Sequence, residues 1–565
     1  MLELQDVHPA TTSDAPHPGS QQMPRWNMGE LPEAPTFRWS TVWTFLGPGL
    51  LMGGAAIGGG EWLQGPLTTA RFGGGLLWLS TLSILGQVLY NIEISRYTLY
   101  SGEPIFTGKF RTLPGPLFWV TLYLVLDFGS IFPYLAASAA TPLAMLLGKV
   151  TSIDDIAANA ALLKWLSIGI FLVSFLPMIF GGKIYNSLKV LMTFKLFVVF
   201  GFLLVLAIGY SHADTWTEIF SGFFKFGQVP VGKTELDNVF VALWEGRGPE
   251  VLSKIDLSTM AMLSALVAIS GQGGLSNTPI SNYTRDQGWG MGSHVGAIPS
   301  LIGGHNIQLS HVGTVFSVDA QSLPRWKRWY KHLLRDQLCV WMPACFIGLA
   351  LPSMLSVEFM PKHTVLEGNE AKWAASVMTA GAVGDRVGGE LGNVFRLMTL
   401  FCGFLVLSTC MASTIDGFVR RWVDVFWTAS KKMHALGPGK IRHLYFGVLV
   451  GYGLLGFTML SLLPEPKALI EAAGVIYNFA LGFSCWHVTV LNGMLLPREL
   501  RPNWFIRFGL ILVGLFFSSV GAIAFFKLAN GDWRIVLVPV VVLPIIAFRV
   551  YVKILAQMSR TAKTS

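Results

Sequence analysis

Charged residues are scarce in this sequence, where they make up 13% of 565 residues while hydrophobic residues make up 52%. A soluble domain of this length needs a larger charged surface, so a soluble globular protein is excluded. The sequence contains no nucleophile elbow, phosphate-binding loop or HExxH motif, and we therefore expect no enzyme and no cofactor. The five cysteines have no zinc-type spacing and are interpreted as packing residues.

Long apolar runs recur along the sequence. Each is roughly 18 to 25 residues long, which is enough to cross the hydrocarbon core of a bilayer as a helix. We predict an all-α integral membrane protein with about twelve transmembrane helices. The expected spans are residues 42–66, 74–98, 116–148, 162–181, 188–211, 258–282, 337–355, 394–424, 441–463, 466–495, 504–527 and 532–555.

The basic residues gather in alternate connections, which predicts the orientation. They follow the second, sixth, eighth and tenth spans, and the densest group is Arg325, Lys327, Arg328, Lys331 and Arg335. Basic loops stay in the cytoplasm, so we expect both termini inside the cell and a location in the cell (inner) membrane. The net charge of +9 therefore follows from basic residues in alternate loops, and no nucleic acid partner is expected.

Three regions are expected along the chain. Residues 1–40 are polar and lack helical periodicity, which predicts a disordered cytoplasmic tail. We expect residues 41–500 to form a core of ten helices, and residues 501–565 to add two helices and a short cytoplasmic end. Two long connections interrupt the core. We expect residues 212–257 outside the cell, on the membrane surface, and residues 283–336 inside it.

Glycines interrupt the first and sixth spans near their middles. The first reads GPGLLMGGAAIGGGEWLQGP and the sixth LSALVAISGQGGLSNTPISNY. Lone glycines in membrane helices usually allow close packing. Runs of three weaken the helix itself, and unpaired backbone groups are tolerated in a membrane only around a cavity or ligand. The two interruptions therefore predict an inverted-repeat transporter with a central site. Its expected lining residues are Gly58, Gly59, Gly60, Glu61, Gly271, Gln272, Gly273 and Gly274.

The stretch from Gly47 to Ser83 resembles the first two helices of the Nramp divalent-metal transporters, from the opening GPG through Trp62 to the FG…LLW segment. Asp127 in LVLDFGS matches an aspartate of their third helix, and residues 412–417 resemble their SSTITG segment. The resemblance implies a LeuT-like fold of five plus five inverted helices with additional C-terminal helices. It also implies secondary transport of a divalent cation.

The metal-site motifs of the family are not present. The DPGN positions hold Gly58, Gly59, Gly60 and Glu61, and the MPH positions hold approximately Gly271, Gln272 and Gly273. The family's third-helix glutamate is replaced by Ser130. Loss of the thioether ligand makes ordinary manganese or iron import doubtful. A Glu61 carboxylate and a Gln272 amide are hard oxygen ligands, so we expect a hard cation such as Mg²⁺, as in Nramp-related magnesium transporters.

Two alternatives are open. Exposed N–H groups at the starts of half-helices bind carboxylates, which would suit a small zwitterionic organic solute. The missing metal ligands would also suit a receptor-like relative that has lost transport.

Four acidic residues fall within the expected spans, where charge is costly and points to function. Glu93 has Arg96 three residues later, and Asp416 has Arg420 four residues later, so local ion pairs are expected for both. Glu61 and Asp127 have no neighbouring base and are the expected proton pathway, with a carboxyl group bonded inside the bundle as the alternative for Asp127. The helical His487 is expected to be a packing residue or a satisfied donor.

Overall fold

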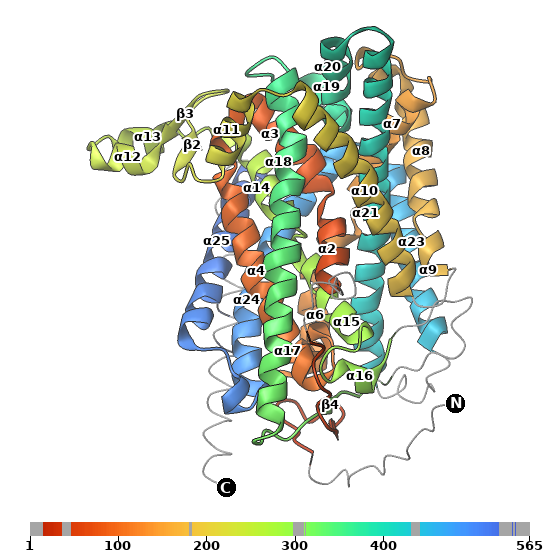
Figure 1. Ribbon diagram of the computed structural model, residues 1–565, viewed down its shortest axis with the longest axis vertical. Helices are drawn as coiled ribbons and strands as arrows, with labels where there is room; N and C mark the ends of the chain where they lie inside the picture. The colour runs from red at the N-terminus through yellow and green to blue at the C-terminus, as the bar shows by residue number, and fades with distance from the viewer. Residues whose placement is uncertain are drawn as a thin grey trace.

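The chain folds into a long bundle of helices (Figure 1). The computed structural model describes residues 15–36, 47–179, 184–297, 310, 312–430, 441–529, 545 and 549. These residues include eight helices long and apolar enough to cross a membrane, or up to ten if each of two bent helix pairs is one span. The protein is thus an all-α, multi-pass membrane protein, as the apolar runs predict.

The first half of the chain contains both interrupted spans. Its elements are β1 (Asn27–Met28), α2 (Pro48–Ala56), η2 (Gly59–Gln64), α3 (Gly65–Phe72), η3 (Gly73–Leu76), α4 (Trp78–Ser101), α5 (Ile105–Arg111), α6 (Pro116–Leu126), η4 (Phe128–Ile131), α7 (Tyr134–Leu146), η5 (Asp154–Asn159), α8 (Ala160–Val173), α9 (Leu176–Ile179), α10 (Ile184–Tyr210), α11 (Ala213–Gly222), β2 (Gln228–Pro230), β3 (Leu236–Asn238), α12 (Val239–Trp244), α13 (Gly248–Lys254), η6 (Leu257–Thr259), α14 (Met260–Ile269), η7 (Gly274–Asn277) and α15 (Pro279–Asp286).

The second half adds the longer, less interrupted helices. Its elements are α16 (Gly292–Val295), β4 (Thr314–Val315), α17 (Ser322–Asp336), η8 (Gln337–Trp341), α18 (Met342–Phe359), α19 (Gly368–Trp373), η9 (Ala374–Ser376), α20 (Met378–Val387), α21 (Gly389–Ala429), α23 (Ile441–Leu462), α24 (Pro466–Leu495), η11 (Arg498–Leu500) and α25 (Trp504–Leu528).

Every expected span from 42–66 to 504–527 overlaps at least one of these helices. The last expected span, 532–555, lies outside the described residues apart from two positions. The seventh span begins earlier than predicted, because α17, η8 and α18 form one continuous helix from Ser322 to Phe359. The basic residues of 325–335 therefore lie on a helix that continues into the membrane, where the sequence predicts a connection.

The expectation of a disordered tail is wrong for residues 15–36, which pack against the lower end of the bundle. Strand β1 pairs in parallel with β4, and Trp26 and Leu31 are buried. The Arg111 guanidinium donates to Pro24 O at 2.6 Å and forms an ion pair with Glu103. Burial acts to raise the pKa of Glu103, but Arg111 outweighs burial and holds that pKa below its usual range. Apolar anchors and this ion pair order the segment.

The two long connections lie at opposite ends of the bundle, as expected. Figure 1 shows α12 and α13 projecting from the upper end, whereas α16 and β4 lie at the lower end. The projecting part exposes large apolar side chains, and Trp244 is 93% exposed. A place on the membrane surface for residues 212–257 stays a prediction, and these exposed side chains favour it.

A labelling experiment tests which end faces the cytoplasm. Lys327 is exposed beside the ordered N-terminal segment, whereas Ser253 is exposed on α13 at the other end. In a background with the exposed Cys339 replaced by serine, we expect Lys327→Cys to react with a membrane-impermeant maleimide only after permeabilisation. Ser253→Cys is the matched control and should react in intact cells. Efficient labelling at position 327 in intact cells would reverse the orientation.

Candidate functional site

The first interrupted span breaks between two half-helices. Helix α2 ends at Ala56, and Ile57 and Gly58 form a turn before the π-helix η2 begins at Gly59. The interruption is therefore shorter than the run of three glycines predicts, since Gly59 and Gly60 already belong to η2. Gly60 has a packing role instead, since a Cβ there would lie 2.1 Å from Ile269 O at the end of α14. The two interrupted spans touch at this point.

The second interruption follows the prediction more closely. Helix α14 ends at Ile269, and residues 270–273 leave the helical conformation before the 3₁₀ turn η7 begins at Gly274. Gly271 has φ +102° and Gly273 has φ +72°, in the region that favours glycine. Helix α15 then starts at Pro279, so the sixth span consists of two half-helices with an extended segment between them.

Glu61 joins the two interruptions. Its side chain is fully buried. One carboxylate oxygen accepts from Gly271 N at 2.9 Å, and the other accepts from Gly58 N at 3.2 Å. These N–H groups belong to the two broken segments. Glu61 and Gly271 are 210 residues apart in the chain. A single carboxylate thus satisfies backbone donors that the breaks leave without helical partners.

A buried lysine lies on the other side of the same break. Lys195, from α10, donates to Ile57 O at 3.0 Å, to Gly54 O and to Cys410 Sγ at 3.1 Å. The Ile57–Gly58 peptide unit is therefore held between an ammonium at its carbonyl and the Glu61 carboxylate at its N–H. Lys195 and Glu61 also attract one another electrostatically.

The second break is ordered by Gln87 from α4. The Gln87 carbonyl oxygen accepts from Gln272 N at 3.0 Å and from Gly273 N at 3.3 Å, and its amide donates to Ser270 O at 2.7 Å. The Gln272 side chain extends to helix α2 and donates to Met52 O at 2.7 Å. Gln272 thus links the two spans a second time, with its amide nitrogen engaged by protein.

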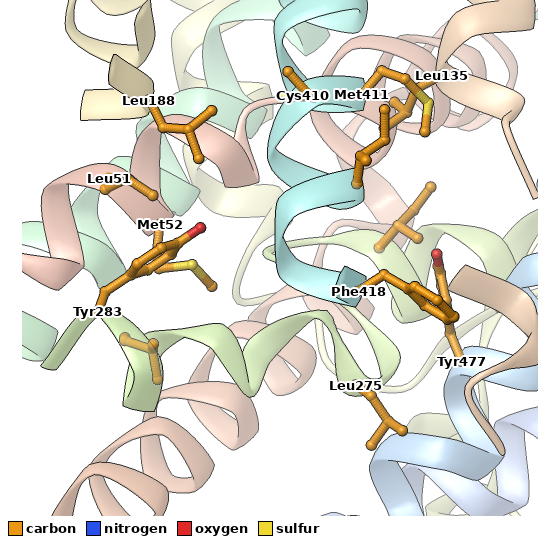
Figure 2. Close-up of a cluster of buried hydrophobic side chains, with 14 of the residues drawn as sticks. Leu51, Met52, Leu135, Leu188, Leu275, Tyr283, Cys410, Met411, Phe418 and Tyr477 are labelled. Carbon is orange, nitrogen blue, oxygen red and sulfur yellow. The ribbon is translucent and has the colours of Figure 1, made fainter. Parts of the chain in front are cut away.

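A small cavity lies directly below the two breaks. It is lined by Met52, Gln272, Ser276, Pro279, Tyr283, Ser413, Thr414, Gly417 and Arg421. Figure 2 shows the packing around it, with Met52 and Tyr283 on one side of α21 and Phe418 and Tyr477 on the other. The lining combines hydroxyl groups, one amide, one thioether and one guanidinium, and none of its side chains is a carboxylate. The lining offers both hydrogen-bond donors and acceptors. Its volume is about 10 Å³, the space of about one water molecule, so the cavity is closed around its lining in this conformation.

A second pocket opens on the opposite side of the break. It is lined in part by Leu63, Gln64 and Arg71 of the first span and by Lys372, Lys467 and Glu471. Gln64 lies three residues after Glu61, and its buried carbonyl oxygen has no hydrogen-bond partner within the described residues. The break around Glu61 therefore separates a pocket beside α3 from the cavity beside α2.

Asp127 differs from the unpaired carboxylate that the sequence predicts. Arg421 NH2 donates to Asp127 Oδ1 at 2.9 Å, and the Trp422 indole donates to Oδ2 at 2.8 Å. The Ser130 hydroxyl adds a third donor at 2.6 Å. This geometry favours the alternative, a carboxyl group bonded within the bundle, over the expected proton carrier.

The local ion pairs are confirmed. Arg96 NH2 lies 2.9 Å from Glu93 Oε1, and Arg420 Nε lies 2.6 Å from Asp416 Oδ2. His487 bonds Thr112 and Tyr123, each at 2.7 Å, and stacks on Trp119, so it is a satisfied packing residue as expected.

A charged network below the cavity was not predicted. It joins α15 to α21 through Arg285 and Asp424, whose charged atoms lie 2.9 Å apart, and through Asp286 and Arg420. The spacing of Asp416, Arg420 and Asp424 at every fourth residue places them on one helix face, which is a readable signal. Lys195, Gln87 and Arg421 carry no comparable signal, because their partners are distant in sequence.

Metal ligands are sparse near the breaks. Within the described part of the chain, no group of three or more His, Cys, Asp or Glu side chains could hold a metal ion. The thioether beside Gln272 belongs to Met52 of the first span. In the Nramp transporters that the sequence resembles, the methionine belongs to the sixth span.

Comparison with known proteins adds evidence about the fold. No protein-family profile matches the sequence, and no curated protein matches it. Among solved structures, a mutant of the Eremococcus coleocola manganese transporter is similar at a TM-score of 0.60 and 14% identity, covering 94% of this chain and 97% of that one. The same transporter bound to an aromatic bis-isothiourea compound is similar at a TM-score of 0.57 and 15% identity, covering 95% and 98%. At these identities the likeness shows the fold, which is the Nramp and LeuT-like fold that the sequence predicts.

Proposed function

We propose that this protein is a secondary active transporter that carries a small solute through the cavity below its two broken helices. The observation that carries the proposal is the Glu61 carboxylate, which bridges Gly58 and Gly271 across the two interruptions. Unstable helix interiors of this kind are maintained in a membrane where they surround a binding site. The likeness in fold to a manganese transporter supports the same class of function.

Alternating access has a simple structural basis in this arrangement. The pocket beside α3 and the cavity beside α2 lie on opposite sides of the same break. Rearrangement of the half-helices around Ile57–Gly58 would connect the solute site to one side or the other. The charged network between α15 and α21 would move with the lower half-helix, because it fastens that half to α21.

The charges around the site favour a small zwitterionic or neutral organic solute. Glu61 is balanced by Lys195, and Asp127 is balanced by Arg421. A divalent cation in this buried setting would bring two uncompensated charges, whereas a solute with no net charge would bring none. The hydroxyl, amide and guanidinium groups of the lining supply hydrogen bonds for such a solute.

Transport of a hard divalent cation such as Mg²⁺ is the second candidate. The Glu61 carboxylate and the Gln272 amide oxygen are the ligands that would hold it, and the fold likeness to a manganese transporter favours it. Proton coupling through Glu61 belongs to this candidate. Asp127 is a weaker member of that pathway, given its ion pair with Arg421.

A binding screen of the purified protein separates the candidates. We expect zwitterionic amino acids to raise the melting temperature in a saturable manner and Mg²⁺ and Mn²⁺ to have no such effect. Gln272→Leu should weaken solute binding roughly tenfold, because it removes about 1.5 kcal/mol of hydrogen bonding from the cavity. Gln228→Leu, in β2 away from the cavity, is the matched control.

Flux into proteoliposomes then distinguishes a transporter from a receptor-like relative. Saturable stabilisation by a solute without its accumulation would favour the receptor alternative. Saturable stabilisation by Mg²⁺ with no response to organic solutes would favour the cation.

A further inference from the structure

Lys109, in α5, is a buried base without an acid beside it. Its side chain is fully buried, and no carboxylate within the described part of the chain forms an ion pair with it. The buried arginines of the described residues each form an ion pair with an acid, and they are Arg96, Arg111, Arg285, Arg420 and Arg421. An ammonium that leaves water without a counterion is costly. The burial of Lys109 therefore needs an explanation other than an ion pair.

Hydroxyl groups and aromatic rings surround Lys109 instead. Its Nζ donates to Tyr90 OH at 3.3 Å and to Ser484 Oγ, and these two oxygen atoms lie 2.6 Å apart. The same nitrogen lies 4.8 Å from the centre of the Tyr123 ring and 5.7 Å from the centre of the Phe106 ring. Helices α4, α6 and α24 thus supply the partners of a side chain that belongs to α5.

These partners fit both protonation states of the amine. A hydroxyl group donates as well as accepts hydrogen bonds, whereas an ionised carboxylate only accepts. The charged form of Lys109 donates to Ser484 and Tyr90 and is attracted to the faces of the rings. The neutral form accepts from one of the two hydroxyl groups and donates to the other. Neither form leaves a buried polar group without a partner, so a proton can be bound and released without unfolding.

The charged groups nearest to Lys109 neutralise one another. Asp127 and Arg421 both act on Lys109 electrostatically, but they are 2.9 Å apart in their own ion pair. The other titratable groups that face Lys109 are Tyr90 of α4, Tyr123 of α6, and Cys485 and His487 of α24. Burial is therefore the dominant influence. Lys109 lies in the connection between the second and third spans, and burial lowers the pKa of its amine to about 7.

We propose that Lys109 binds the proton that drives transport, so that its amine is charged in one state of the transport cycle and neutral in another. The place in the cycle rests on the proposed function, whereas reversible binding of the proton does not. A charge gained at Lys109 acts on the ion pair of Asp127 and Arg421. Arg421 also donates to Leu275 O beside the second break. Lys109 is thus linked through one ion pair to the segment that rearranges.

The pH dependence of stability tests the proton site. Lys109→Met nearly preserves the size of the side chain and removes the amine. An unfolded lysine keeps its proton up to about pH 10.4, whereas folded Lys109 releases it at about pH 7. Between these pH values the unfolded parent binds one more proton, so the parent gains stability as pH rises. Its folding equilibrium constant relative to that of Lys109→Met should increase about tenfold per pH unit between about pH 7 and about pH 9 in denaturant unfolding.

Two further variants make this test specific. Lys109→Gln is a second neutral variant that can bond both hydroxyl groups, and it should give the same trend. Lys164→Met is the matched control, because Lys164 is a half-buried lysine that donates to Ser461 O at 2.8 Å. Its stability relative to the parent should be the same throughout this range. The proton site is wrong if the parent and both neutral variants keep a constant ratio from about pH 6 to about pH 9, or if neither neutral variant folds.

Uptake into proteoliposomes tests the coupling. We expect the parent to take up a radiolabelled mixture of zwitterionic amino acids several-fold faster when the outside is more acidic than the inside. Lys109→Met should not respond to the gradient, and Lys164→Met should respond as the parent does. An unchanged response in Lys109→Met would exclude Lys109 as the coupling site. If the parent takes up no amino acid under any gradient, the proposed function is wrong, and the pH dependence of stability still decides the proton site.

Discussion

Arg421→Met is expected to lower the free energy of unfolding by about 3–5 kcal/mol, because it leaves the buried Asp127 carboxylate without its cation. Arg421 and Asp127 are each 1% exposed, and they join α21 to the start of η4. Arg421 also donates to Leu275 O at 3.1 Å, so its loss loosens the 3₁₀ turn beyond the second break. Unfolding of the purified protein in detergent by heat or denaturant measures the effect.

The double variant Asp127→Asn with Arg421→Met should recover part of that loss, since no unpaired charge is left behind. Lys233→Ala removes an ion pair with Glu367 in which both side chains are largely exposed, and it should change stability little. An Arg421→Met protein as stable as the parent would show that Asp127 does not depend on this pair.

The sequence predicts the fold well because the signals for membrane helices are local. Apolar length identifies the spans, and glycine runs identify the interruptions at Gly58 and Gly271. The same local signals miss how an interruption is stabilised. Lys195 donates to the Ile57 carbonyl from 138 residues away, and Gly271 donates to Glu61 from 210 residues away. Contacts between segments so far apart in the chain leave no local signal.

Charge partners illustrate the same limit. The pairs of Glu93 with Arg96 and of Asp416 with Arg420 are readable, because three or four residues correspond to one helical turn. Asp127 has no base nearby in sequence, and its partner Arg421 lies 294 residues away. A single sequence gives no local signal that links positions so far apart, so an ion pair of this kind is found only in the folded structure.

The prediction of disorder for residues 15–36 is wrong for a different reason. Their polar composition resembles that of a disordered tail, yet a few apolar side chains decide their state. Trp26 packs edge-on against Tyr100, with ring centroids 6.0 Å apart, and β1 gains a partner in β4. The average composition of a segment does not reveal that a few apolar side chains hold it in place.

Glu61→Gln is expected to have a large effect on the site, and the two candidate functions predict different results. A glutamine can accept only one of the N–H groups of Gly58 and Gly271 with its remaining oxygen, and its NH₂ group faces the other donor. The buried unsatisfied N–H should cost about 1–3 kcal/mol in the free energy of unfolding without ligand. The variant should still fold, since size and shape are nearly preserved.

Binding to the variant then identifies the solute class. If a divalent cation uses the Glu61 carboxylate, its affinity should fall roughly tenfold to a hundredfold, since one charged contact contributes about 1.5–3 kcal/mol. A zwitterionic solute should keep its affinity or bind more tightly, because the backbone N–H released by the glutamine becomes available to the solute carboxylate. Titration of the parent and Glu61→Gln proteins with Mg²⁺ and with amino acids measures both. Undiminished Mg²⁺ binding by the variant would exclude Glu61 as a cation ligand, and loss of amino-acid binding would contradict recognition through the released N–H group.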